Sequence, residues 1–167
     1  MDSRAKLFGH SIHQQLVVLP LGMLVGAVAF DVAFLANGSG VMATVAFWMI
    51  VAGIIGGLAA APFGWIDWLA IPRGARAKTI GLTHGLTNVV VLLLFALSAW
   101  LRWDGPERPE AAALAASFAG VILALFGGWL GGELVSRLAI GVYDGAHWNS
   151  PNSLSGRPAH EQSAKSR

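Results

Sequence analysis

The stretch that decides the fold is VMATVAFWMIVAGIIGGLAAAPFGW, residues Val41–Trp65, which contains no charged side chain. An α-helix needs about 20 consecutive apolar residues to cross the hydrocarbon core of a bilayer. This run is long enough, and its one proline, Pro62, lies near its end. The stretch is therefore typical of a transmembrane helix.

Three similar apolar runs surround this stretch, at Ile12–Leu35, Thr79–Leu101 and Ala112–Ile140. Pro20 predicts a kink in the first of them. The connections are short, which forces neighbouring helices to be antiparallel, so we expect an all-α, four-helix membrane bundle with up-down-up-down topology. We assign residues 1–143 to this transmembrane domain. Residues 144–167, rich in Ser, Asn and Pro, are expected to form a flexible polar cytoplasmic tail.

The composition agrees with a membrane environment. Of the 167 residues, 55% are hydrophobic and 12% are charged, about half of the roughly 25% that soluble proteins carry. A net charge of +2 is too small to indicate nucleic-acid binding. The absence of cysteine excludes disulfides, iron–sulfur clusters and cysteine nucleophiles. The sequence also lacks a phosphate-binding loop and the His-Glu-x-x-His motif of metalloproteases.

Positive charge predicts the orientation of the bundle. Nine Lys and Arg residues belong to one face of the membrane, and only Arg102 and Arg108 belong to the other. Loops rich in Lys and Arg stay on the cytoplasmic side. We therefore expect both termini in the cytoplasm. The nine residues are Arg4, Lys6, Arg73, Arg76, Lys78, Arg137, Arg157, Lys165 and Arg167.

Glycines recur at four-residue spacing in every expected helix. Such pairs let helix backbones approach closely. We expect them to pack helices within the bundle, between copies in a homo-oligomer, or against a partner membrane protein. The alternative is that they leave room for a flat cofactor. The pairs are Gly22/Gly26, Gly53/Gly57, Gly81/Gly85, Gly127/Gly131 and Gly128/Gly132.

Ionisable side chains gather in the expected cytoplasmic third of the bundle. His10 and His13 open the first helix, Asp67 closes the second, His84 lies near the start of the third, and Glu133 lies near the end of the fourth. Ionisable groups are costly inside a membrane, so these five are the candidates for function.

Each candidate also has a structural interpretation. The imidazole of His84 would bond to a backbone group or to Asn88, and Glu133 would pair with Arg137 one turn later. Asp67 would cap its helix or pair with Arg73 or Arg76. His10 and His13 would be ordinary interfacial residues. In the outer half, Asp31 lies near the headgroups, and we expect no special role for it.

Two histidines at matched depth on different helices are the arrangement that ligates a b-type haem. His13 and His84 fit it, with His10 as the alternative ligand from the first helix. The three histidines with Asp67 or Glu133 would suit a non-haem metal. We expect haem b and electron transfer, a non-haem metal, or no cofactor. Without a cofactor, the protein would be a structural subunit of a larger membrane complex. A metal or small-solute transporter is a third class of function. The sequence leaves enzymatic activity open.

Five short segments occur in a recognisable order: Gly9-His10-Ser11-Ile12-His13, Gly64-Trp65-Ile66-Asp67-Trp68, Pro72-Arg73-Gly74-Ala75-Arg76, His84, and Gly131-Gly132-Glu133-Leu134-Val135. Together they resemble a bacterial family of predicted membrane proteins, domain-of-unknown-function family 2231, over about residues 9–142. Ser11 and Gln14 stand where the family pattern has prolines. The resemblance implies a four-helix protein of the bacterial inner membrane, sometimes joined to redox modules such as Rieske domains. All five candidate residues fall within its motifs.

Overall fold

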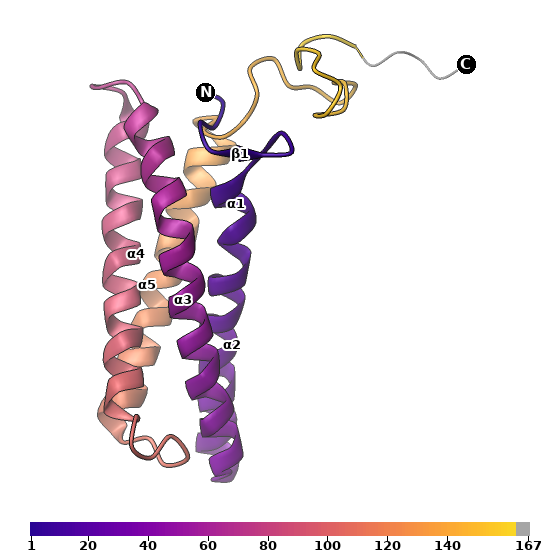
Figure 1. Ribbon diagram of the computed structural model, residues 1–167. Helices are drawn as coiled ribbons and strands as arrows, with labels where there is room; N and C mark the ends of the chain where they lie inside the picture. The colour runs from indigo at the N-terminus through magenta and orange to yellow at the C-terminus, as the bar shows by residue number, and fades with distance from the viewer. Residues whose placement is uncertain (163–167) are drawn as a thin grey trace.

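Four long helical rods run side by side in the computed structural model, which describes residues 1–162 (Figure 1). The first rod comprises α1 (Ile12–Leu16) and α2 (Val18–Asn37), and the others are α3 (Gly40–Ala70), α4 (Arg76–Leu101) and α5 (Ala111–Ser136). Each rod is long and apolar enough to cross a membrane. The all-α, up-down-up-down membrane bundle that the sequence predicts is confirmed.

The first rod is interrupted at Val17, three residues before Pro20. Proline has no N–H and clashes with the preceding turn, so it fits best in the first turn of a helix. Pro20 occupies that turn of α2. The helix break at Val17 lies in the turn before Pro20, where the sequence predicts a kink, whereas Pro62 leaves α3 continuous.

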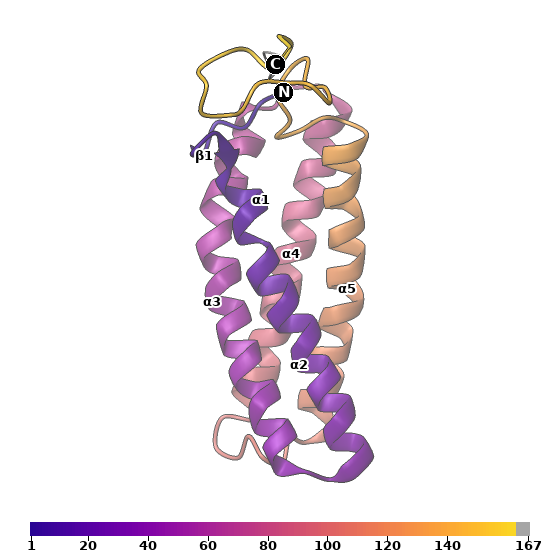
Figure 2. The same ribbon diagram turned by 90° about the vertical axis from the view of Figure 1, so that its right-hand side faces the viewer.

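The two ends of the bundle differ in what they hold. The N-terminus and the last described residues, up to 162, lie at one end, which we call the terminus end (Figures 1 and 2). The α2–α3 turn and the α4–α5 loop form the opposite end, called the loop end. At the terminus end a two-stranded antiparallel ribbon, β1 (Lys6–Leu7) and β2 (His10–Ser11), precedes α1. The sequence analysis did not predict this ribbon.

The fourth span ends earlier than predicted, at Ser136 rather than Ile140. Ala139 takes a positive φ of 51°, which turns the chain away from the helix. The amide of Ile140 then bonds to the carbonyl of Leu134 at 2.9 Å. The second span is longer than predicted and continues to Ala70.

The segment after α5 contacts the N-terminal ribbon. The Tyr143 hydroxyl donates to the carbonyl of Gly9 at 2.6 Å, and the Ser153 hydroxyl donates to the carbonyl of Phe8 at 3.4 Å. The flexibility expected for residues 144–167 stays a prediction, and residues 163–167 lie outside the described part of the chain.

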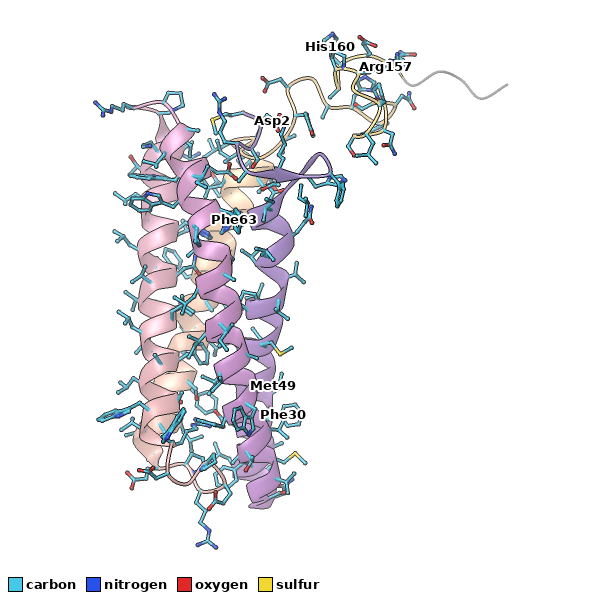
Figure 3. All side chains as sticks on the ribbon, viewed as in Figure 1. Asp2, Phe30, Met49, Phe63, Arg157 and His160 are labelled. Carbon is cyan, nitrogen blue, oxygen red and sulfur yellow. The ribbon has the colours of Figure 1, made fainter. Side chains whose placement is uncertain are left out.

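The bundle is built from two helical hairpins. α2 packs along α3, and α4 packs along α5, each more extensively than the hairpins pack against each other. An apolar core that includes Leu24, Phe47, Ile50 and Phe95 fills the middle. Polar side chains gather mainly toward the two ends (Figure 3). Any polar site must therefore lie toward one end or the other.

Candidate functional site

His13 and His84 meet toward the terminus end of the bundle. Their ring centres are 6.5 Å apart, and the ring planes are nearly perpendicular at 88°. His13 comes from α1 and His84 from α4, so the pair bridges the two hairpins. Both side chains are partly buried. The structure thus brings together the two residues that the sequence analysis pairs as haem ligands.

Backbone carbonyls orient both imidazoles through the same ring nitrogen. His13 Nδ1 lies 3.0 Å from the carbonyl oxygen of Ala60, and His84 Nδ1 lies 2.9 Å from that of Gly127. A carbonyl can only accept, so each Nδ1 carries the proton and each Nε2 keeps a lone pair. A metal-ligating histidine is typically held in this way, with its second nitrogen donating to a carbonyl or carboxylate.

Two glycines allow the imidazoles to reach those carbonyls. A Cβ at Gly64 would lie 2.7 Å from His13 Cε1, and a Cβ at Gly131 would lie 3.2 Å from His84 Cε1. Each glycine follows the anchoring carbonyl by four residues, one helical turn. The missing side chains at Gly64 and Gly131 make room for the two histidine rings.

Asn88 is the other polar neighbour of the pair. Its Nδ2 donates to the carbonyl of His84 at 2.9 Å and lies 3.2 Å from His84 Nε2. The structural interpretation of His84, a bond to a backbone group or to Asn88, is therefore also met. A ligand on His84 Nε2 would require the Asn88 amide to move aside.

The other predicted site residues lie elsewhere. His10 is in β2 rather than in a helix, and its exposed ring is 3.5 Å from the Ser153 hydroxyl. Asp67 accepts hydrogen bonds from the Ser3 hydroxyl at 2.8 and 2.9 Å and from the Arg4 amide at 2.7 Å. Asp67 thus fastens the N-terminal segment to α3 and pairs with neither Arg73 nor Arg76.

Glu133 forms an ion pair with Arg76 at 2.7 Å, so the expected pairing with Arg137 is wrong. Arg76 opens α4, and Glu133 lies in the last turn of α5, which ties the ends of these two helices together. Within residues 1–162, no three His, Cys, Asp or Glu side chains form a group that could hold a metal ion. Of the five predicted metal residues, the structure brings only His13 and His84 together.

The distance between the two histidine rings can be compared with that of two imidazoles bound to one metal atom. A metal-bound imidazole nitrogen lies about 2.0–2.1 Å from the metal. Two such bonds in line, with the distance from nitrogen to ring centre added on each side, separate the ring centres by about 6 Å. The observed 6.5 Å between the ring centres is close to this value.

A second polar cluster, which sequence reasoning missed, lies toward the loop end. Arg102 donates to both carboxylate oxygens of Asp31, at 2.8 and 3.2 Å, and both side chains are fully buried. Arg102 also donates to the Ser98 hydroxyl at 2.9 Å, and the Ser117 hydroxyl donates to Asp31 at 2.9 Å. The expectation that Asp31 has no special role is wrong, because it ties α2 to both α4 and α5.

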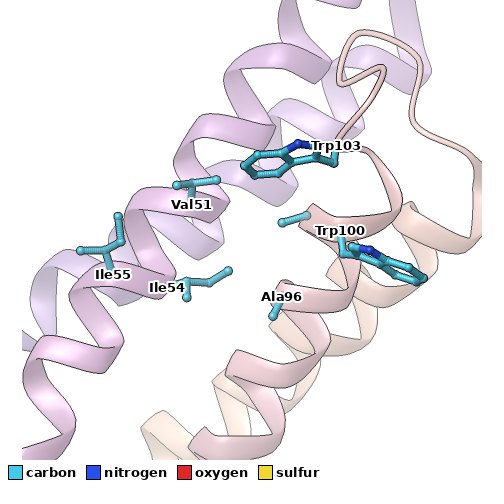
Figure 4. Close-up of a pocket in the computed structure, with 7 residues that line it drawn as sticks. Val51, Ile54, Ile55, Ala96, Trp100 and Trp103 are labelled. Carbon is cyan, nitrogen blue, oxygen red and sulfur yellow. The ribbon is translucent and has the colours of Figure 1, made fainter.

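An apolar groove of about 340 Å³ opens between α3 and α4 (Figure 4). Trp100 and Trp103 stand on one side of it, and Val51, Ile54 and Ile55 stand on the other. None of the five predicted site residues lines this groove. At membrane depth such a surface faces hydrocarbon, and it offers no polar group to a ligand.

The sequence matches the family described as "Predicted membrane protein (DUF2231)" over residues 9–144. The chain belongs to this family. Its matched region includes all four rods and both polar clusters. No curated protein and no solved structure matches the chain.

Proposed function

We propose that this DUF2231 protein is a small electron-transfer protein of the membrane that binds one metal centre between His13 and His84, with haem b as the first candidate. The supporting observation is the pair of imidazoles with ring centres 6.5 Å apart, both anchored through Nδ1. Each Nε2 keeps its lone pair, and that of His84 would become accessible to a ligand once the Asn88 amide moves aside. A non-haem metal held by the same two nitrogens is the alternative cofactor.

The chain's own residues would define the site in three ways. Nε2 of His13 and of His84 would hold the iron, and the carbonyls of Ala60 and Gly127 would keep both rings in the ligating tautomer. The apolar core beside the pair would limit access of water. Haem iron with two imidazole ligands supplies reversible one-electron transfer, at a potential set by its ligands and its burial.

We also propose a location and an orientation. The resemblance to a bacterial family supports the cytoplasmic (inner) membrane, and the division of nine Lys and Arg against two supports cytoplasmic termini. Seven of the nine belong to the described residues, and Lys165 and Arg167 lie outside them. In this orientation the His13–His84 pair faces the cytoplasmic half of the membrane.

The deciding experiment is an absorption spectrum of detergent-purified protein from cells supplied with haem and iron, together with elemental analysis. We expect a low-spin haem spectrum that sharpens on reduction. His84→Ala and His13→Ala should each abolish it, because each removes one of the two ligands. His10→Ala and Glu133→Gln are the matched controls and should keep full haem content, since both residues lie outside the pair.

Three outcomes would change this proposal. A colourless protein with one bound metal that both histidine variants lose would favour the non-haem site. Loss of haem in His10→Ala but not in His13→Ala would transfer the first ligand to His10. A colourless, metal-free wild type would overturn both forms of the site.

The second candidate function, an accessory subunit without a cofactor, is supported by one face of α5. A Cβ at Gly128 or Gly132 would meet no heavy atom of the described residues within 4 Å. These glycines therefore do not pack inside the bundle, and they leave a smooth surface for a second copy or a partner helix. A stable complex that survives purification with a metal-free protein would favour this role.

A further inference from the structure

The two polar clusters share one sequence spacing. Asp31 follows His13 by 18 residues, and Arg102 follows His84 by 18 residues. At about 3.6 residues per turn this is about five turns, so both members of each pair fall on one face of their rod. The two histidines face each other, and Asp31 binds Arg102. The first rod and α4 thus present matching positions to each other.

The buried side chains of α2 recur in α4 at a constant offset of 71 residues, the separation of Asp31 and Arg102. Five residues of α2 are buried, and the residue 71 positions later is buried in every case. α2 and α4 therefore occupy equivalent environments. The matched residues are Pro20 and Val91, Leu24 and Phe95, Ala27 and Ser98, Val28 and Ala99, and Asp31 and Arg102.

α3 and α5 match at an offset of 67 residues, where six of the eight buried residues of α3 have a buried counterpart in α5. Leu24 lies against the space of Gly53, and its counterpart Phe95 lies against Gly120. The histidine contacts repeat this relation. The His13 ring packs against Gly64 and bonds to the carbonyl of Ala60, and the His84 ring packs against Gly131 and bonds to the carbonyl of Gly127. The two offsets, 71 and 67, differ by four residues, which is about one helical turn. The chain between matched positions is therefore four residues longer in the first hairpin than in the second.

We propose that the chain is a duplicated helical hairpin, whose two copies are related by a pseudo-twofold axis along the bundle. Asp31 and Arg102 are the positioning residues that hold the two copies in register and thereby set His13 opposite His84. Residues that contact their own counterparts lie on or near a twofold axis, and both of these pairs do. The consequence for His13 and His84 rests on the function proposed above, whereas the duplication and the register do not.

The ion pair suits this role because it tolerates no displacement. Both side chains are fully buried, and the arginine fork contacts both carboxylate oxygens of Asp31. A shift of one hairpin by a turn would leave two charges without partners inside the bundle, which is strongly unfavourable. The remaining contacts between the hairpins include many apolar side chains, which specify register less strictly.

The duplication predicts how the network can be rebuilt in mirror image. Ser98, which accepts from Arg102, has Ala27 as its counterpart, and Ser117, which donates to Asp31, has Ile50. A mirrored variant therefore exchanges three pairs of residues. Its substitutions are Asp31→Arg, Arg102→Asp, Ala27→Ser, Ser98→Ala, Ile50→Ser and Ser117→Ile.

The test compares this variant with Asp31→Asn and with the charge exchange alone, in full-length protein in detergent. Melting temperature reports the network. A spin-label distance between Gln15 and Leu86, both exposed, reports the alignment of the hairpins beside the histidines, and a label pair at Gln15 and Ile66 within one hairpin is the control. The chain has no native cysteine, so spin labels attach only to the cysteines that are introduced at the chosen positions.

We expect Asp31→Asn to lower the melting temperature by roughly 10 °C and to broaden only the Gln15–Leu86 distance. The mirrored variant should recover more than half of both losses, and the charge exchange alone should recover less. Glu161→Gln, which removes an exposed ion pair, should change neither quantity.

Two results would overturn the proposal. A mirrored variant with no higher melting temperature and no narrower Gln15–Leu86 distance than the charge exchange alone would refute the duplication. This comparison stands even if Asp31→Asn fails to fold. An Asp31→Asn protein with unchanged melting temperature and label distance would refute the positioning role. Neither measurement requires a bound cofactor, so a metal-free wild type would refute the proposed function and leave this test intact.

Discussion

The smallest feature that shapes the candidate site is the hydrogen atom that replaces a side chain at Gly64 and at Gly131. Each imidazole occupies the volume where a Cβ would stand, and from there its Nδ1 reaches a backbone carbonyl one turn earlier. The tautomer of each histidine therefore depends on a glycine of another helix. A methyl group at Gly64 would displace the His13 ring from its hydrogen-bond partner, and a methyl group at Gly131 would shift the His84 ring by a few tenths of an ångström.

Replacing Gly64 with alanine tests this dependence. The new Cβ would lie 2.7–3.1 Å from three atoms of the His13 ring, so we expect a loss of about 1–3 kcal/mol of stability and weaker binding of any centre held by His13. Gly22→Ala is the control, because its Cβ meets no described atom within 4 Å. Thermal unfolding and cofactor content measure both effects, and equal behaviour of the two variants would contradict the role of Gly64.

At the scale of the element, α5 has two faces of small residues with different surroundings. Gly120 and Gly127 receive Phe95 and Asn88 from α4, whereas Gly128 and Gly132 face outward. Gly127 and Gly131 on the inward face have the same four-residue spacing as Gly128 and Gly132 on the outward face, so spacing alone does not reveal which face packs inside the bundle. The inward face explains the extensive packing between α4 and α5.

Two alanine variants of α5 should therefore behave differently. A Cβ at Gly120 would lie 2.8 Å from the Phe95 ring, so Gly120→Ala should lose about 1–3 kcal/mol. Gly128→Ala should keep or slightly raise stability, because alanine favours the helix and meets no described neighbour. Thermal melts in detergent separate the two. Gly128→Leu should change only the association of the protein, measured as the size of the particle in detergent. A destabilised Gly128→Leu monomer would instead place this face inside the bundle.

The helices and the histidine pair were predictable from the sequence because both depend on distance along a single helix. Apolar length fixes each span, and depth within the spans places His13 near His84. The choice among lateral partners was not predictable, since Glu133 has Arg137 one turn away in sequence yet binds Arg76 on a neighbouring helix. The three-residue spacing from His13 suggests a helical position for His10. The same spacing does not exclude the strand in which His10 lies.

Arg102 shows what a further signal would have revealed. It closes the third apolar run, next to Asp104, and so resembles an interfacial residue of a loop. The equal spacing from His13 to Asp31 and from His84 to Arg102 was present in the sequence and connects the two charges. Spacing compared between helices, rather than within one, identifies this kind of pair.

Residues 1–162 contain four candidate membrane spans, so the N-terminus and the segment after α5 lie at the same end of the bundle (Figure 1). Its polar sites lie near opposite ends of an apolar core, so the histidine pair and the ion pair are separated by hydrocarbon-like packing. No described contact joins the two sites by polar groups, and a proton path through the bundle is therefore not part of the proposed function. The orientation decides which side of the membrane can reach the histidines.

Reporter fusions measure that orientation. A reporter fused to the C-terminus should be active only in the cytoplasm, and one inserted at the turn around Gly38 should be active only outside, because seven of the nine Lys and Arg among the described residues lie at the terminus end. Reversed activities would move the histidine pair to the outer half. Exchanging Arg73 and Arg76 for Gln should weaken the orientation if loop charge sets it.

The buried ion pair also has a consequence for biosynthesis. Asp31 and Arg102 are 71 residues apart, and at about 5–20 residues per second a ribosome needs roughly 4–14 s to make that length. The first hairpin therefore leaves the ribosome with a carboxyl group in an apolar helix whose partner has not yet been translated. During this interval the insertion machinery or the lipid headgroups must accommodate Asp31. The first hairpin can settle at its final depth only when the second one brings Arg102.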